Sequence, residues 1–103
     1  KIVLNIGIIL NELVLNAIKH AFTNDDRGVI TVEFEKDIPR NLYIFSVANT
    51  GNDFPETVNP TDSDSLGLQL VTTIAEQMKA RIEFYRSPNT RFTFLIPASL
   101  YQN

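Results

Sequence analysis

The first 22 residues of the chain constrain its fold more than any other segment. Residues 2–22 contain good helix formers and no proline, and their apolar side chains recur at helical spacing. This pattern predicts one helix with a face on a hydrophobic core. The core-facing stripe comprises Ile6, Leu10, Leu13, Ala17 and Ala21. Because a membrane-spanning helix needs about 20 nearly uncharged residues, and Asn5 and Glu12 interrupt this segment, we expect no direct membrane contact.

A polar stripe runs along the same predicted helix, rotated away from the apolar one. Glu12 and Asn16 are one helical turn apart, so a carboxylate and a carboxamide oxygen point into the same space. Magnesium takes one or two such oxygen ligands from protein and others from a substrate phosphate. Lys19 and His20 follow one turn later, where they suit phosphate oxygens. A merely solvated face is the alternative interpretation of all four residues.

The remaining elements alternate between strand and helix patterns. Residues 30–35 predict a half-buried strand, residues 42–48 a central strand, and residues 81–85 and 91–96 two closing strands. Residues 65–79 predict a second helix between the two strand pairs. Its apolar face comprises Leu70, Val71, Ile74, Ala75 and Met78. This order predicts an α/β two-layer sandwich, with a mixed, mostly antiparallel sheet and helices packed on one face.

Length, charge and cysteine content exclude several classes of protein. The 103 residues suffice for a single domain, residues 1–103, and the helical pattern at Lys1 has no cap before it, so we expect a fragment of a longer protein. A net charge of −3 with scattered cations argues against nucleic-acid binding. The absence of cysteine excludes disulfides and thiolate catalysis and fits a cytoplasmic location.

Three short motifs are each ambiguous when taken alone. The strand ending at Asn49 is followed by Gly51, where the backbone can approach a planar ligand closely. Gly67 lies in the first turn of the second predicted helix, where free N–H groups favour an anion. Thr90 stands at the entry of the last strand. An ordinary turn is the alternative interpretation of each motif.

The order of these motifs along nearly the whole chain resembles that of the GHKL ATPases. Residues 11–22, 47–51 with Phe54, 65–71 and 90–92 are similar to the N, G1, G2 and terminal threonine boxes of that superfamily. The greatest similarity is to the ATP-binding catalytic domain of sensor histidine kinases, in the subgroup with a short lid. The lid, a loop that covers the nucleotide, corresponds to residues 57–65.

The resemblance implies that ATP lies between the first helix and the lid. Glu12 and Asn16 are then the catalytic residues. Asn16 binds Mg²⁺, and Glu12 either orients the phosphates or polarises a water as in related ATPases. Lys19 and His20 correspond to phosphate or ribose contacts, and Gly67 to the glycine at the end of the lid. Gly51 corresponds to the glycine packed under the adenine, and Thr90 to the threonine beside the base. The full nucleotide-binding set that the resemblance implies is Asn16, Lys19, His20, Asn49, Gly51, Phe54, Ser65, Leu66, Gly67, Leu68 and Thr90.

Two residues depart from the family pattern at the adenine end of the site. The family usually has aspartate at the position of Asn49, where it accepts a hydrogen bond from the adenine amino group. Asparagine accepts through its carboxamide oxygen without charge assistance, a difference of about 1 kcal/mol or fivefold to tenfold in affinity. Asp53 replaces a second glycine and adds a negative charge near the nucleotide.

The function implied by the resemblance is that of a protein histidine kinase in two-component signal transduction. The domain would bind Mg-ATP and donate the γ-phosphoryl group to a histidine on a neighbouring dimerisation domain of the same protein. The parent protein would be a homodimer, and a response regulator would receive the phosphoryl group from the histidine. That histidine is not His20. Two alternatives remain open: a degenerate, non-catalytic signalling scaffold, and a serine kinase of the anti-sigma-factor type.

Overall fold

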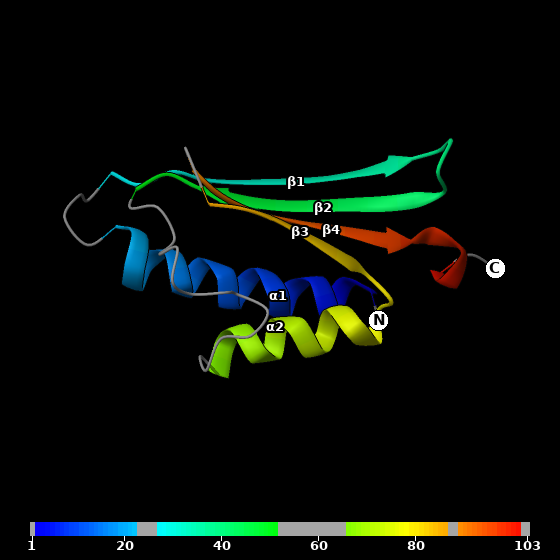
Figure 1. The fold of residues 1–103 in the computed structure, drawn as a ribbon, viewed down its shortest axis with the longest axis horizontal. Helices are drawn as coiled ribbons and strands as arrows, with labels where there is room; N and C mark the ends of the chain where they lie inside the picture. Colours follow the sequence, from blue (N-terminus) through cyan, green and yellow to red (C-terminus); the bar gives the residue numbers. More distant parts are fainter. Residues whose placement is uncertain (1, 23–26, 52–65, 87–88, 102–103) are drawn as a thin grey trace.

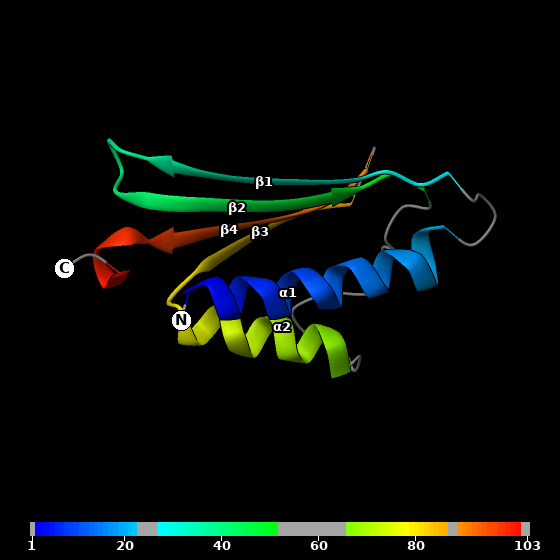
Figure 2. The same cartoon turned by 180° about the vertical axis from the view of Figure 1, so that it is seen from behind.

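A computed structural model describes residues 2–22, 27–51, 66–86 and 89–101 of the chain. Its elements form two layers, a sheet and a pair of helices, in the order predicted from the sequence (Figure 1, Figure 2). The elements are α1 (Ile2–Asn16), the π-helical turn η1 (Ala17–Ala21), β1 (Ile30–Asp37), β2 (Leu42–Asn49), α2 (Leu66–Gln77), β3 (Arg81–Tyr85), β4 (Thr90–Pro97) and the 3₁₀-helix η2 (Ala98–Tyr101). The predicted two-layer α/β sandwich is confirmed.

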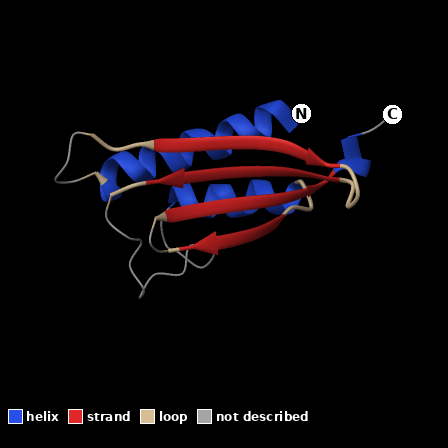
Figure 3. Cartoon of the chain, turned by 90° about the horizontal axis from the view of Figure 1, so that it is seen from above, coloured by secondary structure: helices blue, strands red, loops and turns tan. Residues whose placement is uncertain are grey.

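The four strands form one sheet in the order β1-β2-β4-β3, and each neighbouring pair is antiparallel. The strand predicted to be central, β2, does lie inside the sheet. Both α-helices lie under the same face, and viewed from above the sheet covers them (Figure 3). The register places Phe45 opposite Phe94 and Asn49 opposite Thr90. Directly opposed residues of an antiparallel pair point to the same face, so this register decides which side chains meet.

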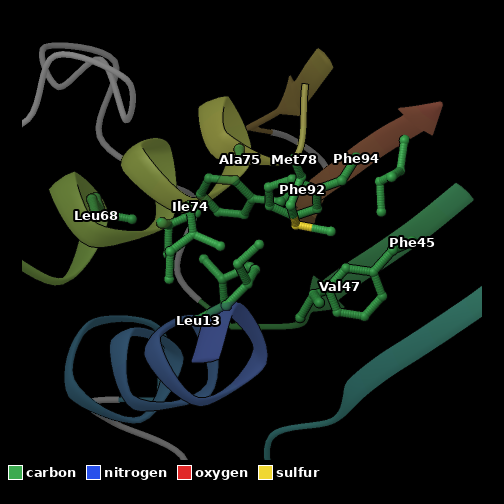
Figure 4. Close-up of a cluster of buried hydrophobic side chains, with 12 residues drawn as sticks. Leu13, Phe45, Val47, Leu68, Ile74, Ala75, Met78, Phe92 and Phe94 are labelled. Carbon is green, nitrogen blue, oxygen red and sulfur yellow. The ribbon is translucent and has the colours of Figure 1, made fainter. Parts of the chain in front are cut away.

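The core lies between the sheet and the helices. Side chains of β4 alternate strictly between buried and half-buried, as expected for a strand with one covered face. The buried apolar cluster, shown in part in Figure 4, comprises Ile9, Leu13, Phe45, Val47, Leu68, Val71, Ile74, Ala75, Met78, Phe92, Phe94 and Ile96. Burying one large apolar side chain contributes about 1.5–3 kcal/mol. This cluster therefore fixes both helices against the strands from which polar residues extend.

Three predictions about local structure were wrong in detail. The first helix is α-helical only to Asn16, and residues 17–21 form a π-helical turn. On α2, Leu70 is 40% exposed and Leu68 is buried in its place. On β1, Val32 and Phe34 are 46% and 50% exposed, so this strand is exposed over most of its length and not half-buried as predicted.

Residues Ile2–Ala21 are long and apolar enough to cross a membrane by length and composition alone. A core helix of a soluble protein passes the same test. Here Ile9, Leu13 and Ala17 are buried against the rest of the domain. The helix thus packs against the sheet and α2 as predicted, but through a stripe that includes Ile9, which was not in the predicted one.

Candidate functional site

The polar stripe of α1 opens onto a cavity at the junction of the two helices. α1 and α2 run antiparallel side by side, so the end of α1 lies next to the start of α2 (Figure 1). A cavity of about 110 Å³ lies at this junction. Its lining, called the helix cluster below, comprises Glu12, Leu15, Asn16, Lys19, His20, Gly67 and Leu68. Six of these seven residues were predicted from the sequence, and the structure brings them together from two segments.

The π-helical turn η1 shapes the end of this cluster. The Phe22 N–H donates to the Ala17 carbonyl oxygen over 3.1 Å, which closes a turn one residue wider than an α-helical turn. Lys19 and His20 lie inside this wider turn and are exposed, whereas Ala17 is buried. Single π-helical turns within α-helices occur frequently at functional sites. No local sequence signal distinguished this turn from a continued α-helix.

A second group of predicted residues lies where β2 ends. Asn49 is paired with Thr90 across β2 and β4, and the Thr90 side chain is 4% exposed. The Asn49 Nδ2 donates to the Thr50 carbonyl oxygen over 2.9 Å. This bond fixes the orientation of the carboxamide and leaves Oδ1 as an acceptor. We call Asn49, Thr50, Gly51 and Thr90 the strand-end cluster.

Gly51 connects the strand-end cluster to η1. Its φ of +103° lies in the region that favours glycine, and a Cβ built on it would lie 2.3 Å from the Ala21 carbonyl oxygen. Only a residue without a side chain allows these two backbones to approach so closely. The two clusters therefore adjoin one another through the end of η1.

Some predicted site residues fall outside the clusters. Phe54, Ser65 and the predicted lid, residues 57–65, lie outside the described residues, as does Asp53. Leu66, the first residue of α2, is highly exposed and does not line the 110 Å³ cavity.

A hollow larger than the helix-cluster cavity was not predicted from the sequence. It measures about 580 Å³ and lies on the sheet face that points away from the helices, because its strand residues alternate with buried ones. Its lining comprises Val29, Thr31, Ala48, Asn49, Thr50, Tyr85, Asn89, Arg91 and Thr93. Arg91 at its edge is paired with Glu33 at 3.4 Å. We assign the functional site to the smaller cavity, because a carboxylate, a carboxamide and two basic side chains line it.

Residues 3–100 match the family described as histidine kinase-, DNA gyrase B- and HSP90-like ATPases. The chain belongs to this ATPase family. A comparison with curated proteins gave no match.

Solved structures agree with the fold of this ATPase domain. The histidine kinase domain of the blue-light activated histidine kinase EL346 from Erythrobacter litoralis superposes with a TM-score of 0.83 at 24% identity, over 92% of this chain and 47% of that one. The catalytic domain of histidine kinase ThkA superposes with a TM-score of 0.72 at 25% identity, over 91% of this chain and 66% of that one. The ATPase domain thus spans about half to two thirds of these two chains, and its fold is that of histidine kinase catalytic domains.

The helix cluster fits a magnesium ion that is bound together with a phosphate. Among residues 2–22, 27–51, 66–86 and 89–101, no group of three or more His, Asp or Glu side chains gathers, so an all-protein metal cage is absent there. Glu12 and Asn16 offer two oxygen-bearing side chains to one cavity. This donor set matches the coordination preference of Mg²⁺, which takes one or two ligands from protein and the others from water and substrate phosphate.

Proposed function

We propose that this ATPase domain binds Mg-ATP and donates the γ-phosphoryl group to a histidine on a dimerisation domain outside the present chain. The observation that carries the proposal is the convergence of Glu12, Asn16, Lys19 and His20 with the start of α2 on one cavity. Membership of the ATPase family supports the nucleotide, and the fold similarity to histidine kinase catalytic domains supports the reaction.

The helix cluster takes the triphosphate in this proposal. The Asn16 carboxamide oxygen holds Mg²⁺, which neutralises charge on the phosphates, and Glu12 orients the metal-bound groups. Lys19 and His20 donate to phosphate oxygens. Gly67 and Leu68 belong to the first turn of α2, where unpaired N–H groups and the helix dipole favour an anion. Positioning and charge neutralisation are what phosphoryl transfer mainly requires.

The strand-end cluster takes the adenine. The Asn49 Oδ1 accepts from the exocyclic amino group, since its Nδ2 already donates to Thr50. The Thr90 hydroxyl lies beside the base, opposite Asn49 in the register. Phe54, Ser65 and Leu66, which the family resemblance assigns to nucleotide binding, complete the proposed site.

Transfer breaks the bond between the γ-phosphorus and its bridging oxygen and forms one to an imidazole nitrogen of the partner domain, releasing ADP. The domain is cytoplasmic in this proposal, whether its parent is soluble or membrane-anchored. The parent protein is a homodimer, and a response regulator accepts the phosphoryl group next. Because the acceptor histidine lies elsewhere, the isolated chain should bind ATP without phosphorylating itself.

Thermal unfolding with and without nucleotide tests the binding step. ATP at about 100 times its Kd should add about 2.7 kcal/mol of stability. We expect this shift to require magnesium and to disappear in Asn16→Ala. Asn11→Ala is the matched control, because Asn11 is exposed on the same helix and does not line the cavity.

The outcome separates the proposal from its alternatives. No shift at millimolar ATP would favour a non-catalytic scaffold. If the parent protein labels itself with γ-labelled ATP, an acid-labile phosphohistidine supports the histidine kinase, and an acid-stable phosphoserine favours the serine kinase.

A further inference from the structure

The contact between Gly51 and Ala21 joins two backbone segments with no room for a side chain. A Cβ on Gly51 would lie 2.3 Å from the Ala21 carbonyl oxygen, 2.9 Å from its carbon and 3.0 Å from Phe22 Cδ1. The first two atoms are backbone, which cannot rotate away as a side chain can. Any larger residue at position 51 must therefore displace either the end of β2 or the end of η1.

The β2 side of the contact is held by hydrogen bonds to β1 and to the residue before β1. Thr50 N–H donates to the Val29 carbonyl oxygen and Val29 N–H donates to Thr50 Oγ1, each over 3.0 Å. These bonds continue the β1–β2 ladder up to the residue before Gly51. A displacement that starts at Gly51 is thus resisted by the sheet.

The η1 side of the contact is a single wide turn, closed by the hydrogen bond from the Phe22 N–H to the Ala17 carbonyl oxygen. Ala17 is buried, whereas Ile18, Lys19 and His20, the three residues between it and Ala21, are exposed. Because these residues lie between the buried Ala17 and the Gly51 contact, a shift at the Ala21 carbonyl is transmitted to Lys19 and His20. Both of these side chains line the helix cluster cavity.

We propose that Gly51 is a positioning residue for the phosphate end of the nucleotide site. Its missing side chain lets the end of β2 press against η1, and this contact holds Lys19 and His20 at the cavity with Glu12 and Asn16. The role differs from a glycine packed under the adenine, which the family resemblance implies. This inference rests on the proposed nucleotide binding and specifies which part of the nucleotide Gly51 serves.

Ligands with different numbers of phosphates distinguish the two roles. Displacing η1 weakens contacts to phosphates, whereas Asn49 and Thr90 stay in the strand ladder and keep their contacts to the base. The loss of affinity in Gly51→Ala should therefore grow from adenosine through ADP to ATP. A glycine beneath the base would instead lower all three affinities by the same factor.

The experiment is calorimetric titration of this chain with adenosine, ADP and ATP in the presence of Mg²⁺. We expect Gly51→Ala to lower ATP affinity about tenfold or more and adenosine affinity less than about threefold, as loss of one charge-assisted contact would. In a Lys19→Ala background the same substitution should cost less, because the two changes act on one contact. Gly7→Ala is the matched control, since a Cβ at Gly7 meets no atom within 4 Å.

Three results would overturn the inference. One is an equal loss for adenosine and ATP in Gly51→Ala, another is unchanged ATP affinity in a folded variant, and the third is full additivity with Lys19→Ala. If Gly51→Ala does not fold, Ala21→Gly loosens the η1 side of the contact without adding atoms, and the same phosphate dependence is required of it. Failure of the unaltered chain to bind any of the ligands would instead overturn the proposed function itself.

Discussion

The helix cluster and the strand-end cluster are built on different principles. Helix spacing places Glu12 and Asn16 on one face of α1, so the same pattern exists in the isolated helix. Asn49 and Thr90, by contrast, meet only because β2 and β4 pair in one register. The helix cluster contains two basic side chains, whereas the strand-end cluster contains neutral hydrogen-bonding groups. The helix cluster is thus suited to charged phosphate groups, and the strand-end cluster to the hydrogen-bonding edge of a base.

Removing a charge from the helix cluster should give the largest difference between the losses of ATP affinity and adenosine affinity. Lys19→Ala takes an ammonium from the helix cluster, and a charge-assisted hydrogen bond contributes about 1.5–3 kcal/mol. We expect ATP affinity to fall at least about tenfold while adenosine affinity stays within about twofold. Lys79→Ala, at an exposed position beyond the C-terminal end of α2, is the charge-matched control. Equal losses for both ligands would show that the two halves are not separate.

Asn49→Asp tests the strand-end cluster, because it should lower the stability of the free chain and raise its affinity for the ligand. The carboxylate loses the N–H that now donates to the Thr50 carbonyl oxygen, so the free chain should be about 1 kcal/mol less stable. A charged acceptor strengthens the bond from the adenine amino group, so adenosine and ATP should each bind about fivefold more tightly. Chemical denaturation of the free chain and titration of the variant measure the two effects separately. Weaker binding of both ligands would contradict the assignment of Oδ1 as the acceptor.

A smaller change is expected from Thr90→Val, which removes a hydroxyl and keeps the shape of the side chain. A neutral hydrogen bond contributes about 1 kcal/mol, so affinity for adenosine and for ATP should fall about threefold to fivefold. The ratio of the two affinities is the decisive measurement. If the loss is confined to ATP, Thr90 serves the phosphates and the division between the clusters is wrong. Thr73→Val, exposed on α2, controls for the loss of a threonine hydroxyl.

The α1 and η1 residues Glu12, Asn16, Lys19 and His20 of the helix cluster were predictable because a helix imposes its own spacing. The core was less so: Ile9 is 1% exposed but was not in the predicted stripe, and Leu70 was predicted to be buried in place of Leu68. On a helix that is apolar nearly all round, neighbouring stripes differ by one residue, and the packing of α1 against α2 decides between them.

The parts of the site that could not be predicted from the sequence depend on contacts between segments far apart in the chain. The pairing of Asn49 with Thr90 and the approach of Gly51 to Ala21 join segments far apart along the chain. Thr90 and Gly51 entered the site through the family pattern, since each residue alone is typical of a turn. The π-helical form of η1 also has no local signal, and it accompanies the close approach of Gly51.

The last prediction tests whether both clusters are independent of the far end of the sheet. Asp37 pairs with Leu42 at the opposite end of the β1–β2 ladder from Asn49, and its carboxylate is 2.7 Å from Arg40 Nε. The side-chain hydrogen bond from Arg40, together with one from the Arg40 backbone N–H, lowers the pKa of Asp37 below its ordinary value of 3.8.

A carboxyl group whose pKa is lowered by folding stabilises the fold above its unfolded pKa, and this stabilisation is lost as the pH falls through the folded value. Asp37→Asn should therefore reduce stability slightly at pH 7 and weaken the loss of stability that occurs as the pH falls below about 4. Urea denaturation across this range measures the change, and adenosine and ATP affinities at pH 7 should be unaltered. A change in either affinity would mean that the β1–β2 hairpin influences the nucleotide site through the sheet, and the clusters would then have to be treated as one unit with it.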